Sequence, residues 1–451
     1  AENPAGVLVT LGGQTPLKLA NPLLQAGVPI MGTQPEAIDL AEDRERFAAL
    51  LDEMAIAYPP SGTASSPAEA VEVAGRLGFP LLVRPSYVLG GRGMVIAYDK
   101  PSLEEFIQEA ARVTPDHPVY LDHFLESATE VDVDALCDGQ EVYIGGILEH
   151  IEEAGIHSGD SSCCIPPFSL SQAITNEIRD ITTRLALAVG VRGLVNIQFA
   201  VKDTQIYVIE VNPRASRTVP FTAKATAVPL AKCAARIMAG AKISELGLPP
   251  DTQELDHFSV KEAVMPFGRF PGADIILGPE MKSTGEVMGT GSSYPIAYAK
   301  AALAIDYSLP TQGTAFISVC DKDKRSIMSV ATLLRHNGFE IISTKGTART
   351  LSAAGIPVRV VGKALDDHPN IIDELNDGNV NLMINTPYGQ ETRDDGFILR
   401  TTAIRQGIAY ATTMAGANAI VRAIEVAKND AERRDNGESG DLDPIALQDL
   451  G

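Results

Sequence analysis

Long hydrophobic segments are missing from this sequence of 451 residues. No run reaches the roughly eighteen apolar residues that a membrane-spanning helix needs, so no membrane partner is expected. The first residues contain no basic stretch followed by an apolar one, and no signal peptide is expected. An initiator methionine is also missing, so we expect the chain to be a fragment of a longer protein.

Basic residues and cysteines are few. Lysine and arginine together number 37 against 58 aspartates and glutamates, and the net charge is −21. Because nucleic acid is bound by basic surfaces, this balance argues against nucleic acid as a partner. The five cysteines never occur in CxxC spacing, so no disulfide framework is expected and a cytoplasmic location is favoured. The adjacent Cys163 and Cys164 are interpreted as small buried or loop residues rather than catalytic thiols.

The chain is longer than one hydrophobic core usually supports, so several domains are expected. Helices mixed with antiparallel strands indicate an α+β domain first, and regular strand–helix alternation indicates a small doubly wound α/β domain afterwards. The expected divisions are a Rossmann-like remnant at 1–33, an α+β domain at 34–235, a mixed connector at 236–308, the doubly wound domain at 309–428 and a polar, disordered tail at 429–451.

Two segments carry the pattern of a helix start. Residues 34–79 are expected to be helical, with a capping box at Ser66-Pro67-Ala68-Glu69. The same pattern recurs at Ser102-Leu103-Glu104-Glu105, ahead of an apolar stripe at helical spacing. Both segments therefore predict helices beside the strands of the α+β domain.

A hairpin near the middle of the chain carries the most specific chemical signal. Residues 194–201 and 205–211 are expected to be its strands, and side chains alternate between faces along each strand. Folding back should bring Gln198 close to Glu210, and clustered oxygen donors of this kind suit magnesium. A solvated polar face is the alternative. The side chains expected on the polar face are Asn196, Gln198, Glu210 and Asn212.

Arginines stand beside two of the expected strands. Arg214 and Arg217 directly follow the hairpin and are suited to bidentate phosphate contacts. Arg84-Pro85-Ser86 ends another strand and precedes Gly90-Gly91-Arg92-Gly93, whose main-chain N–H groups could approach a phosphate closely. A glycine-rich loop can also be a simple turn, so the arginine before it strengthens the phosphate interpretation.

Two further segments could face a ligand. Three acids share one strand face in Glu130-Val131-Asp132-Val133-Asp134. Because like charges repel, such a row needs a cation, hydroxyl groups or arginines opposite it. The alternative is that this face is an exposed edge. Within the segment from Gly155 to Asp160, His157 could contact phosphate, act as a base or be a polar loop residue. A base is the least favoured role, because phosphoryl transfer depends mainly on positioning and charge neutralisation.

Together these residues resemble the ATP-grasp superfamily, and within it the large chain of carbamoyl-phosphate synthase. The resemblance covers nearly the whole chain and points to the second of that family's two homologous halves, with 34–235 as the ATP-grasp domain. The segments that carry it are Ala41-Glu42-Asp43-Arg44, Val83-Arg84-Pro85-Ser86-Tyr87-Val88-Leu89-Gly90-Gly91-Arg92, Glu130-Val131-Asp132-Val133-Asp134, Gly155-Ile156-His157-Ser158-Gly159-Asp160-Ser161 and Ile209-Glu210-Val211-Asn212-Pro213-Arg214.

The resemblance implies that ATP phosphorylates carbamate to give carbamoyl phosphate, for pyrimidine and arginine biosynthesis. It implies a nucleotide site lined by Arg84, His123, Leu125, Glu130, Gly155, Ile156, His157, Ser158, Gln198 and Glu210. It implies magnesium or manganese ions held by Gln198, Glu210 and Asn212, and potassium near Glu130 and His150. The catalytic cations that it implies are Arg44, Arg84, Arg214 and Arg217, with Arg44 on phosphate or product. The implied partners are the N-terminal half of the large chain and a glutaminase small chain.

The last domain resembles the methylglyoxal-synthase-like regulatory domain of the same family. Thr344 ends a strand just before a helix, where main-chain N–H groups and hydroxyls form a phosphate pocket. The resemblance implies a nucleotide effector, such as uridine or inosine monophosphate, bound by Thr344, Thr347, Lys363 and Asn385. Pro387 departs from the threonine common in the family, and a purely structural turn is the alternative.

Two other functions are weighed against this one. The first is another ATP-grasp ligase, such as a biotin carboxylase or a purine-pathway carboxylate–amine ligase, although these generally lack such an effector domain. The second is a nucleotide-binding regulatory fragment without turnover. An assay of nucleotide hydrolysis separates binding from catalysis.

Overall fold

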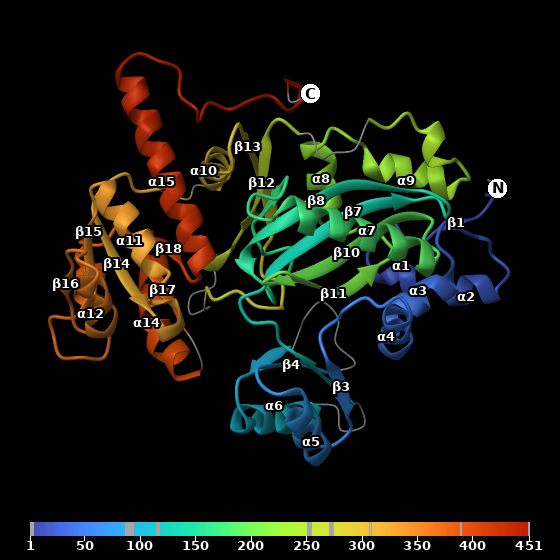
Figure 1. The fold of residues 1–451 in the computed structure, drawn as a ribbon, viewed down its shortest axis with the longest axis horizontal. Coiled ribbons are helices and arrows are strands. Elements are labelled where there is room, and N and C mark those ends of the chain that lie inside the picture. Colours follow the sequence, from blue (N-terminus) through green and yellow to red (C-terminus); the bar gives the residue numbers. More distant parts are fainter. Residues whose placement is uncertain are drawn as a thin grey trace. The chain divides into compact units, whose positions relative to one another are not determined.

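The computed structural model describes residues 4–85, 94–113, 118–249, 255–269, 275–305, 307, 309–387 and 390–449. The chain forms two compact units, the first made of residues 1–159, 163–257 and 446–451, and the second of 160–162 and 258–445 (Figure 1). The segment expected as a connector, 236–308, is thus divided between them. None of the helices in the described ranges is long and apolar enough to cross a membrane.

The first unit begins with two short parallel strands, β1 (Val7–Leu8) and β2 (Ile30–Met31), with helices α1 (Gln14–Lys18) and α2 (Ala20–Gln25) between them. The strand expected at 7–11 is therefore only two residues long. Helices α3 (Pro35–Glu42) and α4 (Arg44–Glu53) follow, and the Asp43 carboxylate caps α4 by accepting the Arg46 N–H. This cap fixes Arg44 at the first position of its helix.

A four-stranded sheet with the order β3-β6-β4-β5 comes next, with α5 (Pro67–Leu77) and α6 (Lys100–Val113) on one side of it (Figure 1). Its apolar core joins both helices to the strands. Leu103 and Ile107 of α6 are among the buried residues of this core. The strands are β3 (Ser61–Ala64), β4 (Leu81–Pro85), β5 (Val95–Ala97) and β6 (Val119–His123).

Two local predictions in this region were wrong. Residues 34–79 are not helical throughout, because β3 pairs antiparallel with β6. The sequence Ser-Gly-Thr-Ala has no apolar alternation, so the strand depends on its partner, and Gly62 lets it pack directly against Val73. The start of α6 is at Lys100 rather than after Ser102, since Asp99 accepts the Ser102 N–H. The capping box at Ser66 is confirmed, with the hydroxyl accepting the Glu69 N–H.

The large sheet of the first unit has the strand order β11-β10-β7-β8-β9. The predicted hairpin is present as β10–β11 around Asp203-Thr204, and β7–β8 form a second hairpin around Asp138-Gly139. Helix α7 (Gln172–Val189) packs on the apolar face through Ile178 and Leu185. Helices α8 (Val219–Ala225) and α9 (Leu230–Met238) contribute to a separate cluster with Leu136 and Leu194 on the other face. The strands are β7 (Thr129–Cys137), β8 (Val142–Glu153), β9 (Cys163–Ile165), β10 (Gly193–Lys202) and β11 (Gln205–Asn212).

The second unit contains an antiparallel pair and a parallel sheet. Strands β12 (Phe258–Val264) and β13 (Gly285–Gly291) pair beneath α10 (Tyr294–Ala304), and Gly289 allows the helix backbone close approach. The parallel sheet has the order β16-β15-β14-β17-β18, so the predicted doubly wound arrangement is confirmed. Its strands are β14 (Thr314–Val319), β15 (Glu340–Ser343), β16 (Arg359–Val360), β17 (Leu382–Thr386) and β18 (Ala409–Ala411). Its helices are α11 (Ile327–His336), α12 (Lys345–Ala353), α13 (Ile371–Asn376), α14 (Gln390–Arg405) and α15 (Met414–Asp435).

The expected disordered tail, 429–451, begins inside helix α15. Asp430 is buried and accepts the Leu442 N–H at 2.9 Å, while Arg434 contacts both Asp430 and Asp443. These ion pairs hold the chain after the helix against its last turns, which a prediction from polarity alone cannot anticipate. Four single turns of 3₁₀ helix complete the described elements, at Ile243–Glu245, Phe267–Arg269, Asp321–Asp323 and Leu447–Asp449.

Candidate active site and effector site

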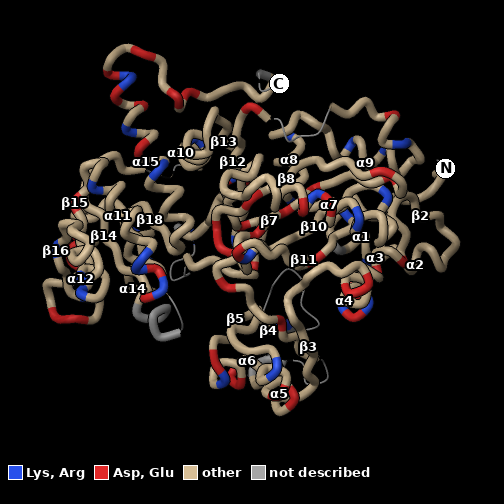
Figure 2. Tube along the Cα trace, in the orientation of Figure 1, with Lys and Arg blue, Asp and Glu red and all other residues tan. Residues whose placement is uncertain are grey.

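One face of the large sheet is polar at its centre, and the other is apolar. Val133, Ile197 and Val211 belong to the core beneath α7. On the opposite face, strand pairing sets Asp132, Gln198 and Glu210 in one row across β7, β10 and β11. Acidic residues accordingly cluster around β7 and β8 (Figure 2). The adjacent row consists of Asp134, Asn196 and Asn212.

The predicted closeness of Gln198 to Glu210 is confirmed, and it depends on a β-bulge. Pairing from the turn places Phe199 opposite Val208, and an unbroken ladder would then set Gln198 opposite Ile209. The register shifts between Gln198 and Phe199, so that Glu210 becomes the partner of Gln198. Ile209 is the extra residue and is exposed. The bulge therefore determines which side chain of β11 faces the amide.

A chain of contacts joins the end of β11 to the arginine after it. The Asn212 amide donates to Glu210 Oε1 at 2.7 Å, and the Arg214 guanidinium donates to Asn212 Oδ1 at 3.0 Å. Arg214 also approaches Glu42, although burial outweighs its attraction and raises the pKa of that carboxyl. Arg217 is exposed. The structure thus brings Gln198, Glu210, Asn212 and Arg214 together, and the side-chain oxygens of the first three fit a magnesium ion.

Asp122 of β6 joins two of the predicted catalytic arginines. Arg44 donates to Asp122 Oδ1 at 2.8 Å, and Arg84 donates to Oδ2 through Nε at 2.8 Å and through Nη2. The Arg44 guanidinium also lies 4.7 Å from the centre of the Tyr120 ring. Burial raises the pKa of Asp122, while Arg84 opposes that shift. Asp122 was not predicted as a site residue, although its place beside His123 offered a signal.

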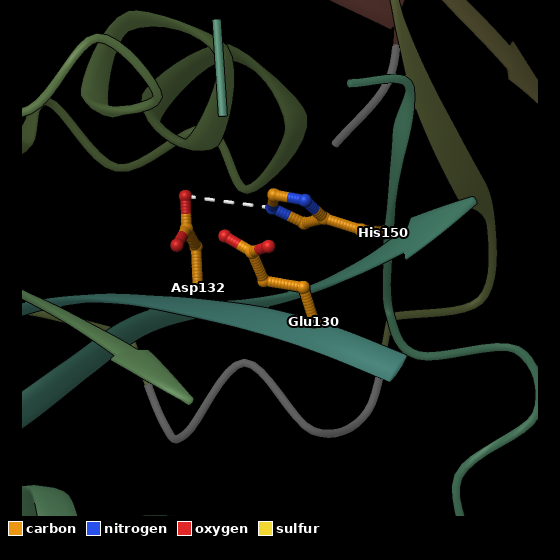
Figure 3. A group of neighbouring side chains, drawn as sticks. All are labelled: Glu130, Asp132 and His150. Carbon is orange, nitrogen blue, oxygen red and sulfur yellow. Dashed lines mark ion pairs between the residues drawn. The ribbon is translucent and has the colours of Figure 1, made fainter. Parts of the chain in front are cut away.

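Glu130, Asp132 and His150 converge on the polar face from β7 and β8 (Figure 3). All three are buried, their ligand atoms lie within 4.8 Å of one another, and His150 Nε2 is 3.5 Å from Asp132 Oδ2. Asp132 Oδ1 has no hydrogen-bond partner among the described residues. Burial raises the pKa of Glu130 to about 7. Two carboxylates gathered with no neutralising arginine among the described residues suit a bound cation.

The remaining predicted nucleotide residues lie around the ends of these strands. The Gly155 N–H donates to Glu130 Oε2 at 3.1 Å, which links the loop after β8 to β7. Gly155 has a φ of 95°, and an added Cβ would lie 2.5 Å from the Phe124 ring. His157 Nδ1 accepts the Gly159 N–H at 3.0 Å, so the ring is held within its loop.

The other predicted nucleotide residues take no part in the hydrogen bonds just described. Leu125 is buried in a small apolar cluster, and His123 Nδ1 is buried with no hydrogen-bond partner among the described ranges. Ile156 and Ser158 lie in the same partly buried loop as His157. The predicted phosphate loop at Gly90-Gly91-Arg92-Gly93 lies outside the described residues.

In the second unit, hydroxyl and amide groups meet at the carboxyl ends of β14, β15 and β17. Thr344 Oγ1 is 3.2 Å from Ser318 Oγ, and the Asn385 amide donates to the Ser318 carbonyl at 3.2 Å. The fully buried Arg400 donates to Asn385 Oδ1 at 3.3 Å. This edge is where the strand order reverses, between the neighbouring strands β14 and β17, which is the usual position for a ligand in such sheets.

Two predicted effector residues behave differently from this group. Thr347 is buried, and its hydroxyl exchanges hydrogen bonds with the main chain of Val319, which ties α12 to β14. Lys363 is exposed, and the contact described for it is local, from its N–H to Asp366. Arg400 and Ser318 were not predicted, because a cation inside a helix and a serine inside a strand carry no motif.

Three family models match the sequence. The one described as carbamoyl-phosphate synthase L chain, ATP binding domain, matches residues 43–246. The carbamoyl phosphate synthase preATP-grasp domain matches residues 1–40, and the MGS-like domain matches residues 326–412. Their order along the chain agrees with the order of domains expected from the sequence.

Curated relatives align with nearly the whole chain. The carbamoyl phosphate synthase large chain of Archaeoglobus fulgidus is 54% identical over 429 residues, and that of Methanothermobacter thermautotrophicus is 53% identical over 430. Each alignment covers 95% of this chain, and the chain spans 40% of the length of those relatives.

Two solved structures share the fold of about two thirds of the chain at low identity. A biotin carboxylase from Campylobacter jejuni, solved as a complex with an ATP analogue, aligns with a TM-score of 0.55 and 16% identity, over 67% of this chain and 74% of its own. An N5-carboxyaminoimidazole synthase from Aspergillus clavatus, solved with ADP, aligns with a TM-score of 0.52 and 16% identity, over 64% and 79%. Both likenesses concern the ATP-grasp fold alone.

Proposed function

Because the chain belongs to the carbamoyl-phosphate synthase large-chain family, we propose that it phosphorylates carbamate with ATP to give carbamoyl phosphate and ADP. The single observation that carries the proposal is the bulged pairing of Gln198 with Glu210, which aligns oxygen donors beside Asn212 and Arg214. Phosphoryl transfer needs this combination of a cation site and adjacent guanidinium groups.

Each part of the site has its own role in the proposed reaction. Gln198, Glu210 and Asn212 hold magnesium or manganese, which neutralises phosphate charge when bound. Arg214 and Arg217 bind the transferring phosphoryl group and orient carbamate. Asp122 holds Arg44 and Arg84 as a pair that presents its remaining N–H groups to the nucleotide phosphates. Glu130 and Asp132 supply oxygens suited to potassium, whereas the His150 imidazole nitrogen is a poor ligand for that ion.

The second unit regulates the first in this proposal. Thr344, Asn385 and the N-terminal end of α12 bind the phosphate of a nucleotide effector, and Thr347 keeps that helix end against β14. To contact the effector phosphate as well, Lys363 would have to reach it from its exposed position. The rest of the large chain would supply carbamate and a glutaminase small chain would supply ammonia, as the family membership suggests.

The test is the reverse reaction, which avoids unstable carbamate. ATP formation from ADP and carbamoyl phosphate is measured with magnesium for the wild type, Glu210→Gln and the control Glu177→Gln, whose side chain is exposed on α7. Loss of a charge-stabilising group should lower the rate of Glu210→Gln about 1000-fold, and the control should match the wild type. Equal rates in both variants would refute the assignment of Glu210.

A fragment that binds without turnover gives a different result. The wild type would bind magnesium–ADP in calorimetry yet form no ATP, and the binding would weaken in Glu210→Gln. Transfer from ATP to another carboxylate, with no reaction of carbamoyl phosphate, would instead favour a different ATP-grasp ligase.

A further inference from the structure

Asp134 lies at the centre of β7 and is completely buried. It stands in the row beside Asp132, but it belongs neither to the proposed metal ligands nor to the groups that contact nucleotide. Its carboxylate points to the polar face of the sheet, where α8 and the segment before it pass. A buried carboxylate away from the reacting groups must be compensated by its neighbours.

Four side-chain donors surround this carboxylate. Oδ1 accepts from the Asn196 amide at 3.0 Å and from the Ser216 hydroxyl at 2.8 Å. Oδ2 lies 2.8 Å from the hydroxyls of both Thr218 and Thr222. None of these donors carries a charge, so hydrogen bonds alone offset the burial, which by itself raises the pKa of Asp134.

Two of the donors come from the segment that carries the proposed phosphate-binding arginines, and a third comes from the helix that follows it. Ser216 lies between Arg214 and Arg217, Thr218 directly follows them, and Thr222 lies on α8. The Ser216 hydroxyl also accepts the Val219 N–H at 3.2 Å, so the same group forms the start of α8. The fourth donor, Asn196, pairs in register with the proposed metal ligand Asn212.

We propose that Asp134 is a positioning residue, which fixes the segment 214–218 against the metal-binding strands so that Arg214 and Arg217 face the transferring phosphoryl group. The role of these arginines rests on the proposed function, whereas the anchoring of their segment does not. Asp134 connects the two halves of the site, the strands that hold the cation and the loop that holds the anion.

Limited trypsin digestion tests the anchoring without any activity. Trypsin cleaves after arginine, so the bonds after Arg214 and Arg217 report directly on whether the segment opens. In Asp134→Asn, one carboxylate acceptor becomes a donor among hydroxyls, and cleavage at these two bonds should be roughly tenfold faster. The control is Asp138→Asn, since Asp138 is also buried in the β7–β8 hairpin and accepts three main-chain N–H groups.

Mass spectrometry identifies the bonds that trypsin cleaves, and thermal melting compares the stability of the variants. Selective cleavage after Arg214 and Arg217 in Asp134→Asn alone supports the proposal. Unchanged cleavage there, or the same increase in Asp138→Asn, overturns it. Should Asp134→Asn fail to fold, Thr222→Val and Thr222→Ser take its place, because only the first removes a donor to Asp134.

Kinetics of ATP formation test the consequence for the site. Displaced arginines should lower kcat about 100-fold in Asp134→Asn, while KM for ADP changes by less than about threefold. Thr222→Val should show a smaller loss of kcat, and Thr222→Ser should restore it. A normal kcat in Asp134→Asn, with an active wild type, overturns the positioning role. A wild type without activity refutes the proposed function instead, and the digestion then decides the anchoring by itself.

Discussion

The two candidate sites are built from opposite chemistry. In the first unit, acidic side chains from antiparallel strands gather on a buried face, where Glu130, Asp132 and Glu210 occupy neighbouring positions. In the second unit, hydroxyl and amide groups of Ser318, Thr344 and Asn385 meet at the ends of parallel strands. The first arrangement attracts cations, and the second leaves donors for an anion, so the two sites should respond differently to the same change.

The largest effect should come from removing Asp122, the acid that holds Arg44 and Arg84. Asp122→Ala leaves two partly buried guanidinium groups without their shared partner, which should lower the free energy of unfolding by about 3 kcal/mol. Denaturant unfolding measures this loss. The control Asp52→Ala, at an exposed carboxylate near Tyr58, should change stability by less than about 0.5 kcal/mol. Similar values for both would mean that Asp122 is not structurally coupled to the arginines.

The acidic face should also make stability depend on pH. Glu130 has its pKa raised to about 7 in the folded protein, from 4.5, so the folded state keeps a proton that the unfolded state has lost. Stability should therefore be greatest below about pH 4.5 for this group and fall by about 3 kcal/mol as pH rises through 7. Thermal melting of wild type and Glu130→Gln from pH 5 to 8 should show this slope only in the wild type.

A potassium titration at pH 8 sharpens that measurement. If the cluster binds potassium, the ion should restore much of the lost stability in the wild type and little in Glu130→Gln. A wild type whose stability rises between pH 5 and 8 relative to the variant would contradict the raised pKa.

A smaller effect is expected at the loop that closes the acidic face. Gly155→Ala introduces a Cβ at positive φ and against Phe124, and it should cost about 2 kcal/mol and weaken ADP binding. Gly190→Ala has a similar φ but open space around it, so it should cost only about 1 kcal/mol. Calorimetric ADP titrations and unfolding curves of both variants isolate the Phe124 contact. Equal ADP affinity in the two variants would show that Gly155 is not part of the nucleotide site.

The smallest effect should be in the second unit. Thr344→Ala removes one hydroxyl near the start of α12 and should weaken binding of uridine or inosine monophosphate about tenfold, by loss of a charged hydrogen bond. ATP formation without effector should be unchanged. The exposed Thr332→Ala on α11 serves as the control for the assay. Unchanged effector binding in Thr344→Ala would leave this edge as a structural strand–helix turn.

The polar face could be predicted because alternation along strands depends only on local sequence. The hairpin turns, the apolar floor and the doubly wound second domain follow from such local patterns. The bulge at Ile209 could not be predicted. Without it Gln198 would pair with Ile209, so the predicted closeness of Gln198 to Glu210 is confirmed only because the bulge shifts the register by one residue. A one-residue register shift depends on packing against the partner strand, which the sequence of the hairpin does not encode alone.

Residues that act through long-range contacts were missed for the same reason. Asp122 acquires its role from Arg44, which lies 78 residues earlier, and Arg400 from Asn385 on a neighbouring strand. The strand β3 forms only because β6 is available to pair with it. Side chains with no motif of their own become recognisable once the fold sets them beside charged groups.

The hairpin β10–β11 also has a consequence for the order of folding. Gln198 and Glu210 approach each other as soon as one short turn closes, an event that takes microseconds in isolated hairpins. The contact between Asp134 and Thr222 spans 88 residues, so it must wait until the sheet and α8 have assembled. We therefore expect the oxygen donors to meet early in folding and the arginine segment to dock late, as the last part of the site to become native.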